Sequence, residues 1–188
     1  SSISPNVVEA PDGSITAEKL VPNSGAALNT ASTVIGQHGL ASNSYCFSVY
    51  AKAAGLDRVR VRIMDAVTYA ITHAVVSLVD GSYATAPGTT GSYTNATGAV
   101  EKMANGWFRI SIYGVPNSSN TLVAQILPYS STLNSGDGTS GIYIWGAQLE
   151  QGPTALPYQR NDGNLGGVAT GASTDLHWLE TDGVDDGM

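Results

Sequence analysis

The chain has 188 residues and a formal net charge of −7, because 15 acidic side chains outnumber 8 basic ones. Charged residues make up only 12% of the sequence and hydrophobic residues 42%, which excludes a disordered solvating polymer and predicts one domain, or one domain with a tail. So few basic residues argue against nucleic-acid binding as the main role, and no apolar run approaches the ~20 residues of a membrane-spanning helix, so we expect no membrane insertion.

The predicted elements are short β-strands, because Gly, Pro, Asn or paired Ser interrupts the sequence about every ten residues. In chain order, weak strands are expected at 17–21 and 28–35, alternating strands at 45–53 and 58–65, an apolar strand at 74–79, a weak one at 93–102, an alternating one at 107–115, and apolar ones at 121–127 and 141–149. About nine such strands predict an all-β fold, an antiparallel two-sheet β-sandwich of the jelly-roll type.

The end of the chain differs from the rest. Residues 159–174 are rich in Gly, Asn and Ala, and the last 28 residues carry six acidic side chains and no Lys or Arg. The first 160 residues, in contrast, are nearly neutral, with nine acidic against eight basic side chains. We therefore expect a sandwich over residues 1–158 and an extended C-terminal arm over 159–188. Because the chain starts without Met and stops in mid-pattern, we interpret it as a fragment of a longer polypeptide.

The alternating strands suggest one candidate binding face. If residues 45–53, 58–65 and 107–115 share a sheet, their non-core sides bring together four of the five arginines, Lys52 and several aromatic rings. Guanidinium groups and flat rings suit sugars, since the first bind hydroxyls and carboxylates and the second cover the apolar side of a pyranose. The candidate carbohydrate-binding residues are Tyr50, Arg60, Arg62, Trp107, Arg109, Tyr113, Gln125 and Trp145.

Other interpretations of this face stay open. The same residue types are enriched at subunit interfaces, and an outer sheet face can also be plain solvated surface. Trp145 lies in so apolar a strand that it fits the core as well as a stacking platform, and Trp107 follows a turn at a strand start, where either role is possible.

No catalytic constellation is found in the sequence. Most carboxylates fall in turns or at strand ends, and no pair stands on one strand at i, i+2 spacing as a glycosidase acid and nucleophile could. The three histidines are scattered, and no Gly-x-Ser-x-Gly elbow exists for a serine nucleophile. We therefore predict a protein that is not an enzyme.

Cysteine and metal chemistry are equally limited. Cys46 is the only cysteine, which excludes an intrachain disulfide and a cysteine zinc cluster, and it is interpreted as a small filler inside a strand. We expect no cofactor; if a loop holds a structural calcium ion, Asp12 and Glu150 are the candidate ligands.

Four motifs together carry a family resemblance. They are residues 11–20 (PDGSITAEKL), 47–53 (FSVYAKA), 105–111 (NGWFRIS) and 144–152 (IWGAQLEQG), the last followed by Pro157 and Tyr158. In this order they resemble a jelly-roll module, similar to carbohydrate-binding modules, of tailed-phage tail fibres, tail spikes and head spikes. The resemblance covers roughly residues 8–158 and implies a β-sandwich that binds surface polysaccharide, usually on a trimeric fibre. Residues 179–186 look like the opening strand of a laminin-G-like module.

The resemblance and the candidate face together lead to one expected function. It is a non-catalytic receptor-binding module of a phage tail fibre, extracellular on the virion, that recognises a host capsule or lipopolysaccharide glycan and assembles as a homotrimer. The alternative is a structural domain of a virion fibre whose arginine and aromatic face is the trimer interface. A third possibility is a fragment of a depolymerase.

Overall fold

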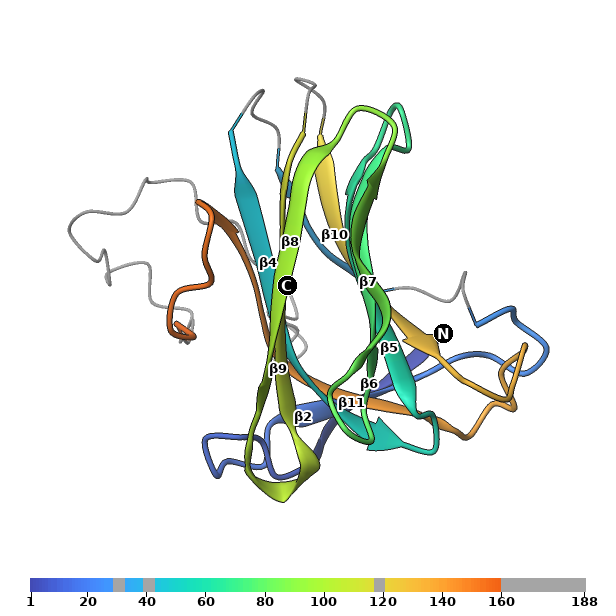
Figure 1. The fold of residues 1–188 in the computed structure, drawn as a ribbon. Helices are drawn as coiled ribbons and strands as arrows, with labels where there is room; N and C mark the ends of the chain where they lie inside the picture. The colour runs from blue at the N-terminus through green and yellow to red at the C-terminus, as the bar shows by residue number, and fades with distance from the viewer. Residues whose placement is uncertain (29–32, 39–42, 117–120, 160–188) are drawn as a thin grey trace, which may run out of the picture.

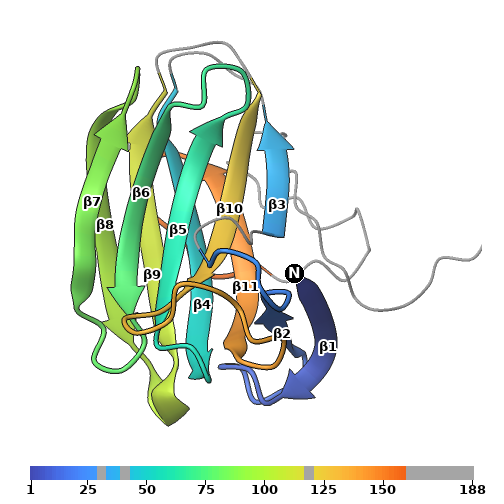
Figure 2. The same ribbon diagram turned by 90° about the vertical axis from the view of Figure 1, so that its right-hand side faces the viewer.

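The computed structural model describes residues 1–28, 33–38, 43–116 and 121–159, with only the backbone of 33–38. In these residues, eleven strands form two antiparallel sheets that pack face to face (Figures 1 and 2), which confirms the all-β sandwich. The predicted arm falls almost wholly outside the described residues, as does 29–32 of the strand expected at 28–35.

One sheet has six strands and the other five. The six-stranded sheet has the order β1-β2-β11-β4-β9-β8, and its strands are Ser2–Val8 (β1), Ala17–Val21 (β2), Gly141–Gln151 (β11), Tyr45–Ala54 (β4), Phe108–Val115 (β9) and Thr94–Lys102 (β8). The five-stranded sheet has the order β3-β10-β5-β6-β7, formed by Thr33–His38 (β3), Leu122–Tyr129 (β10), Arg58–Asp65 (β5), Ile71–Ser77 (β6) and Tyr83–Thr90 (β7).

Eight of the strands follow jelly-roll order, with β2-β11-β4-β9 facing β3-β10-β5-β6, and β1, β8 and β7 extend the edges. The sequence did not predict β1 or β7. Both contain a proline, Pro5 and Pro87, and both are mostly exposed edge strands, so neither shows an apolar alternation. In the described residues the single helical element is the short 3-10 turn Ala104–Gly106, and none of their helices has the length and apolar character of a membrane span.

The core forms where the inward side chains of the two sheets meet. Phe47 and Val49 of β4 and Ile110 of β9 are fully buried against Val61 and Ile63 of β5. Burying each such side chain is worth about 1.5–3 kcal/mol. The predicted alternation in these strands is therefore confirmed: inward positions are core and outward positions are the faces available for function.

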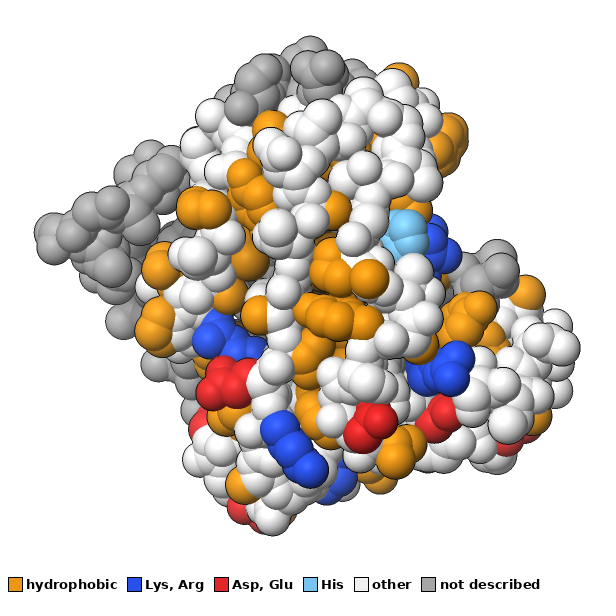
Figure 3. All heavy atoms as spheres, in the orientation of Figure 1, with side chains coloured by type: hydrophobic (Ala, Val, Ile, Leu, Met, Phe, Trp, Pro, Cys, Tyr) orange, Lys and Arg blue, Asp and Glu red, His pale blue; other side chains and the backbone are white. Residues whose placement is uncertain are grey.

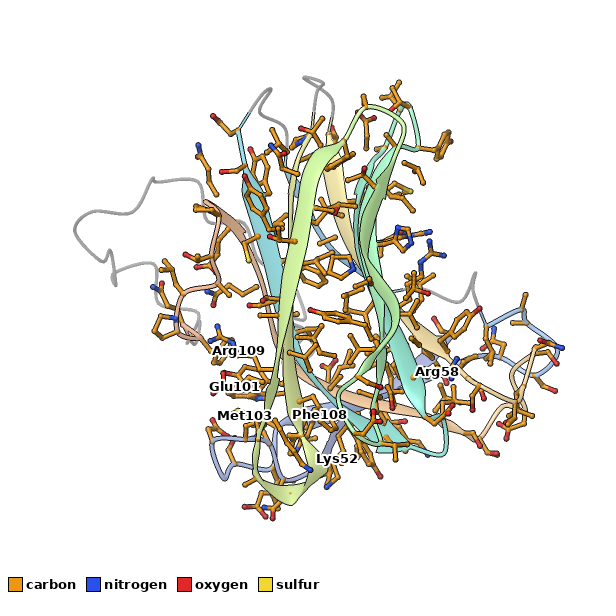
Figure 4. The ribbon with its side chains drawn as sticks, viewed as in Figure 1. Lys52, Arg58, Glu101, Met103, Phe108 and Arg109 are labelled. Atoms are coloured by element: carbon orange, nitrogen blue, oxygen red, sulfur yellow. The ribbon has the colours of Figure 1, made fainter. Side chains whose placement is uncertain are left out.

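The assumption that the three alternating strands share a sheet is wrong. β4 and β9 are neighbours in the six-stranded sheet, whereas β5 lies in the five-stranded one. Three residues, Gly55 to Asp57, take the chain from β4 across to β5. Alternation shows which side chains point inward but not which sheet a strand joins. The arginines of β5 and the arginine of β9 consequently point away from each other, as Arg58 and Arg109 show in Figure 4.

Gly141 at the start of β11 offers a test of the packing between β11 and β2. A Cβ atom there would overlap the backbone carbonyl of Leu20, whereas one at Gly88 would meet nothing closer than 3.8 Å. We expect Gly141→Ala to lower the free energy of unfolding by about 1–3 kcal/mol and Gly88→Ala to change it by less than ~0.5 kcal/mol. Denaturant unfolding measures both; equal stability of the two variants would contradict this register.

Candidate functional site

The predicted site residues divide between two outward faces. The aromatic face is the outer side of β11, β4 and β9, and it carries Trp145, Tyr50, Arg109 and Tyr113, with Trp107 just before β9. The arginine face is the outer side of β10, β5 and β6, formed by Gln125, Arg58, Arg60, Arg62 and His73. The structure thus brings the eight predicted residues together as two groups and not as one.

Tyr50 is the centre of the aromatic face. Strand register places it between Trp145 of β11 and Arg109 of β9. Its ring meets the Trp145 ring edge-on with centroids 5.2 Å apart, and the Arg109 guanidinium carbon lies 5.5 Å from its centroid. These contacts are an edge-to-face aromatic pair and a cation–π pair, so each ring already has a partner within the protein.

A bulge in β11 shapes this face next to Trp145. The pairing with β4 shifts between Trp145 and Gln148, and Gly146 adopts a φ of 58°, where a side chain is strained. A Cβ atom at Gly146 would come within 3.1 Å of Tyr50 and 3.2 Å of Tyr158. The glycine therefore gives Tyr158 room to pack on Trp145, with ring centroids 4.4 Å apart.

Residues 152–159, here called the strap, lie across the aromatic face. Arg109 donates from Nη2 to the Leu156 carbonyl oxygen, and the Leu156 amide donates to Oε2 of Glu150 at 3.1 Å. The Gln159 amide donates to Oε1 of Gln148 at 3.0 Å. The outward polar side chains of β9 and β11 therefore hold the chain's own C-terminal segment.

The N-terminal segment covers the other tryptophan. Nε1 of Trp107 donates to the Glu9 carbonyl at 3.2 Å, and Nε1 of Trp145 donates to Oγ1 of Thr16 at 3.0 Å. Trp107 is only 2% exposed and Tyr50 8%, so neither ring is accessible as a stacking platform for a ligand. For Trp107 the core interpretation holds; Trp145 is half-buried between its two aromatic neighbours.

The arginine face is built by one strand and its two neighbours. Arg58, Arg60 and Arg62 alternate along β5 with buried valines and isoleucine, which turns all three guanidinium groups outward. On the β10 side they face Tyr129, Leu127 and Gln125, and on the β6 side Ser77, Val75 and His73. All three arginines are half-buried, and the aliphatic stem of Arg60 lies between the apolar Leu127 and Val75.

The individual arginines differ in their partners. Nε of Arg62 donates to Oε1 of Gln125 at 2.5 Å, which fixes the direction of that guanidinium group. Arg60 stands between Leu127 and Val75, neither of which offers a side-chain acceptor, and its buried Nε has no hydrogen-bond partner within the described protein. Gln125 and Arg62 therefore lie on one face, separate from the Tyr50, Trp107, Arg109 and Tyr113 with which the sequence predicts them.

Within the described strands of this sheet, basic side chains outnumber carboxylates. Within the five strands of this sheet the one carboxylate is Asp65, which is fully buried and accepts the Val67 and Thr68 amides at 2.8 Å each. Burial lowers the pKa of Arg60 and Arg62, and the charge of Arg60 lowers that of Arg62 further. Both stay cationic at neutral pH, because an arginine pKa lies far above 7.

Several of the remaining carboxylates accept hydrogen bonds in loops, Asp80 and Asp137 within one turn and Asp57 from a distant loop. Oδ1 of Asp57 accepts the Ser131 amide at 2.9 Å, Oδ1 of Asp80 the Ser82 amide at 3.0 Å, and Oδ1 of Asp137 the Ser140 amide at 2.6 Å. The Ser140 hydroxyl and then the Ser140 amide lower the pKa of Asp137, and the Ser82 amide, with the Ser77 and Ser82 side chains, brings that of Asp80 to about 2. The carboxylates are acceptors in the loops that close the sandwich, as their positions in the sequence indicated.

The structure also shows the surroundings of Cys46 and of the candidate metal ligands. Cys46 is buried, and burial followed by the charge of Glu150 raises the pKa of its thiol to about 12, as expected of a filler. Over the described ranges, no three His, Cys, Asp or Glu side chains gather as a metal site. Of the two candidate calcium ligands, Asp12 accepts the Ser14 amide and Glu150 the Leu156 amide.

No protein-family model matches the chain, and no curated protein matches it. Function must therefore be inferred from the two faces and from the motifs of the sequence. His73 is the one residue of the arginine face that the sequence did not single out. Its signal was its outward position in β6, which becomes meaningful only when the register places it opposite Arg62.

Removing the Arg109 side chain tests how the strap is held. We expect Arg109→Ala to speed hydrogen exchange of the Leu156 amide about tenfold or more, since a hydrogen bond from a charged group is worth about 1.5–3 kcal/mol. Lys52→Ala removes a positive charge from the same sheet and is the matched control. Unchanged exchange in Arg109→Ala would show that the strap does not depend on this contact.

Proposed function

We propose that this domain is a non-catalytic binding module that recognises acidic polysaccharide through its arginine face. The observation that carries the proposal is the row of three outward arginines on β5, in a sheet whose single strand carboxylate is buried at the end of that strand. The aromatic face is a weaker candidate, because the strap and the N-terminal segment already occupy it.

The chemistry of the row suits a polymer with repeated acidic groups. A guanidinium group offers two parallel donors that match the two oxygens of a carboxylate. Outward residues two apart on a strand are separated by about 6.6–6.8 Å, so an extended acidic chain laid along β5 would meet one guanidinium group after another. Such open sites are weak singly and become effective through multivalency.

The setting we propose comes from the sequence motifs. Their resemblance to jelly-roll modules of phage fibres and spikes supports a receptor-binding domain on a virion, assembled as a homotrimer and directed at host capsule or lipopolysaccharide. Three copies on one fibre would provide the multivalency. The use of Asp57, Asp80 and Asp137 as hydrogen-bond acceptors in loops supports a role without catalysis.

One observation favours a second candidate, a structural domain whose arginine face is a subunit interface. The outward residues next to the arginines include the half-buried Met64 of β5 and Tyr129 of β10, whereas Leu127 and Val75 are already covered within the protein. Arginine, methionine and tyrosine are enriched at protein interfaces. The same variant tests both candidates, because the readouts differ.

The double variant Arg60→Ala with Arg62→Ala is the decisive change. We expect binding to an acidic capsular oligosaccharide to fall at least about tenfold, since each charged hydrogen bond is worth about 1.5–3 kcal/mol. Calorimetric titration measures the affinity, and circular dichroism checks the fold.

The control variant Lys52→Ala with Lys102→Ala removes the same charge from the six-stranded sheet and should bind normally. An equal loss of affinity in the arginine and lysine variants would mean that binding depends only on the net charge of the protein. Unchanged binding by the arginine variant would remove this face from consideration, and a shift from trimer to monomer in sedimentation would identify it as an interface instead.

A further inference from the structure

His73 is a half-buried outward residue of β6 next to the arginines. In the register it faces Arg62 on one side and Gly88 of β7 on the other, and a glycine has no side chain to cover it. Histidine and basic side chains touch at the right-hand edge of Figure 3, on the side of the five-stranded sheet. The charges of both Arg60 and Arg62 act on the imidazole, that of Arg60 more strongly.

Two buried nitrogen atoms at this position have no hydrogen-bond partner within the described protein. They are Nε of Arg60 and Nδ1 of His73. Nε of the adjacent Arg62, in contrast, is satisfied by Gln125. Leaving such a buried atom unpaired costs about 1–3 kcal/mol, and most buried polar atoms in folded proteins are paired. The hydrogen bonding is therefore incomplete at Arg60 and His73, whereas Nε of Arg62 is paired with Gln125.

We propose that Arg60 and His73 together hold one acidic group of the ligand, a carboxylate whose oxygens accept from Nε of Arg60 and from protonated Nδ1 of His73. This inference rests on the proposed polysaccharide function and specifies its ligand class. A neutral sugar hydroxyl would leave the clustered positive charge uncompensated. A carboxylate supplies both acceptor oxygens and a negative charge, and Arg62 stays oriented by Gln125 to bind a neighbouring group.

The proposed contact of Arg60 and His73 with a carboxylate makes ligand binding dependent on pH. Burial, then the charge of Arg60, then that of Arg62 lower the pKa of His73, so the free protein holds it neutral at pH 7. Facing it from β5 are these two arginines, from β7 Gly88 followed by the uncharged bulge residues Pro87 and Ala86, and along β6 the uncharged Ile71 and Val75. A bound carboxylate adds the missing negative charge and raises that pKa, so binding takes up a proton and strengthens as pH falls.

Stability of the free protein should change in the opposite direction. A histidine with a lowered folded-state pKa is protonated more readily when unfolded, so the free protein loses stability as pH falls through and below the ordinary value of about 6.5. The ligand should offset that loss.

The test is titration of the protein with a hexamer of galacturonic acid at constant ionic strength, from about pH 8 to about pH 5.5, where the uronic carboxylates stay ionised while histidine titrates. We expect the wild-type affinity to rise at least about fivefold over this range. His73→Asn should bind within about twofold of wild type at the alkaline end and lose the rise, since neutral His73 contributes little there. His38→Asn, a histidine change in β3, is the matched control and should keep the rise in affinity.

Imidazole NMR titration of His73 gives a readout that needs no ligand: Arg60→Ala should raise the His73 pKa toward its ordinary value. Binding without pH dependence, or a rise in affinity at low pH that survives His73→Asn, would overturn the proposed Arg60–His73 site while leaving the proposed function intact. Absence of wild-type binding to the uronate and to other acidic oligosaccharides at every pH would overturn both. An unshifted His73 pKa in Arg60→Ala would contradict the geometry of the pair directly.

Discussion

The packing of β4 and β9 against β5 across the core determines which side chains of these strands point outward and are available for binding. Inward residues such as Phe47, Val61 and Ile110 are completely buried at this contact. Because side chains alternate along a strand, filling the core on one side fixes which residues point outward on the other. The two outward faces are thus separated by both sheets, about 10 Å apart, and neither can share a ligand with the other.

The fold was largely predictable because its central strands alternate clearly, and the misses have physical reasons. β1 and β7 bury almost nothing and contain Pro5 and Pro87, so no periodicity marks them. The position of β5 in the second sheet depends on the direction taken by the short link after Ala54, and a pattern of inward and outward residues has no information about that direction. Strand identity could be predicted from the sequence; sheet membership could not.

The candidate site shows the same limit at the level of single residues. That Arg60 and Arg62 point outward followed from alternation, and Gln125 joins Arg62 as expected. The burial of Trp107 depends on the Glu9 carbonyl, 98 positions away, and the contribution of His73 depends on register with β5. Contacts between distant segments are not encoded in local pattern, so both required the folded structure.

Arginines of similar exposure acquire different roles because their neighbours differ. Arg109 stands opposite Glu101 (Figure 4), lies over the Tyr50 ring and donates from Nη2 to the strap, so the protein's own groups surround its guanidinium group although its Nε stays unpaired. Arg60 has apolar neighbours and an unused donor. In a chain of net charge −7 this positive row does not attract anions from afar, since physiological salt screens charges beyond about 8 Å. Recognition must therefore occur at contact range, where the neighbours of each guanidinium group decide the outcome. Arg60 and Arg109 each keep an unpaired buried Nε, but Arg109 already donates to the strap from Nη2, whereas the register neighbours of Arg60 offer no side-chain acceptor.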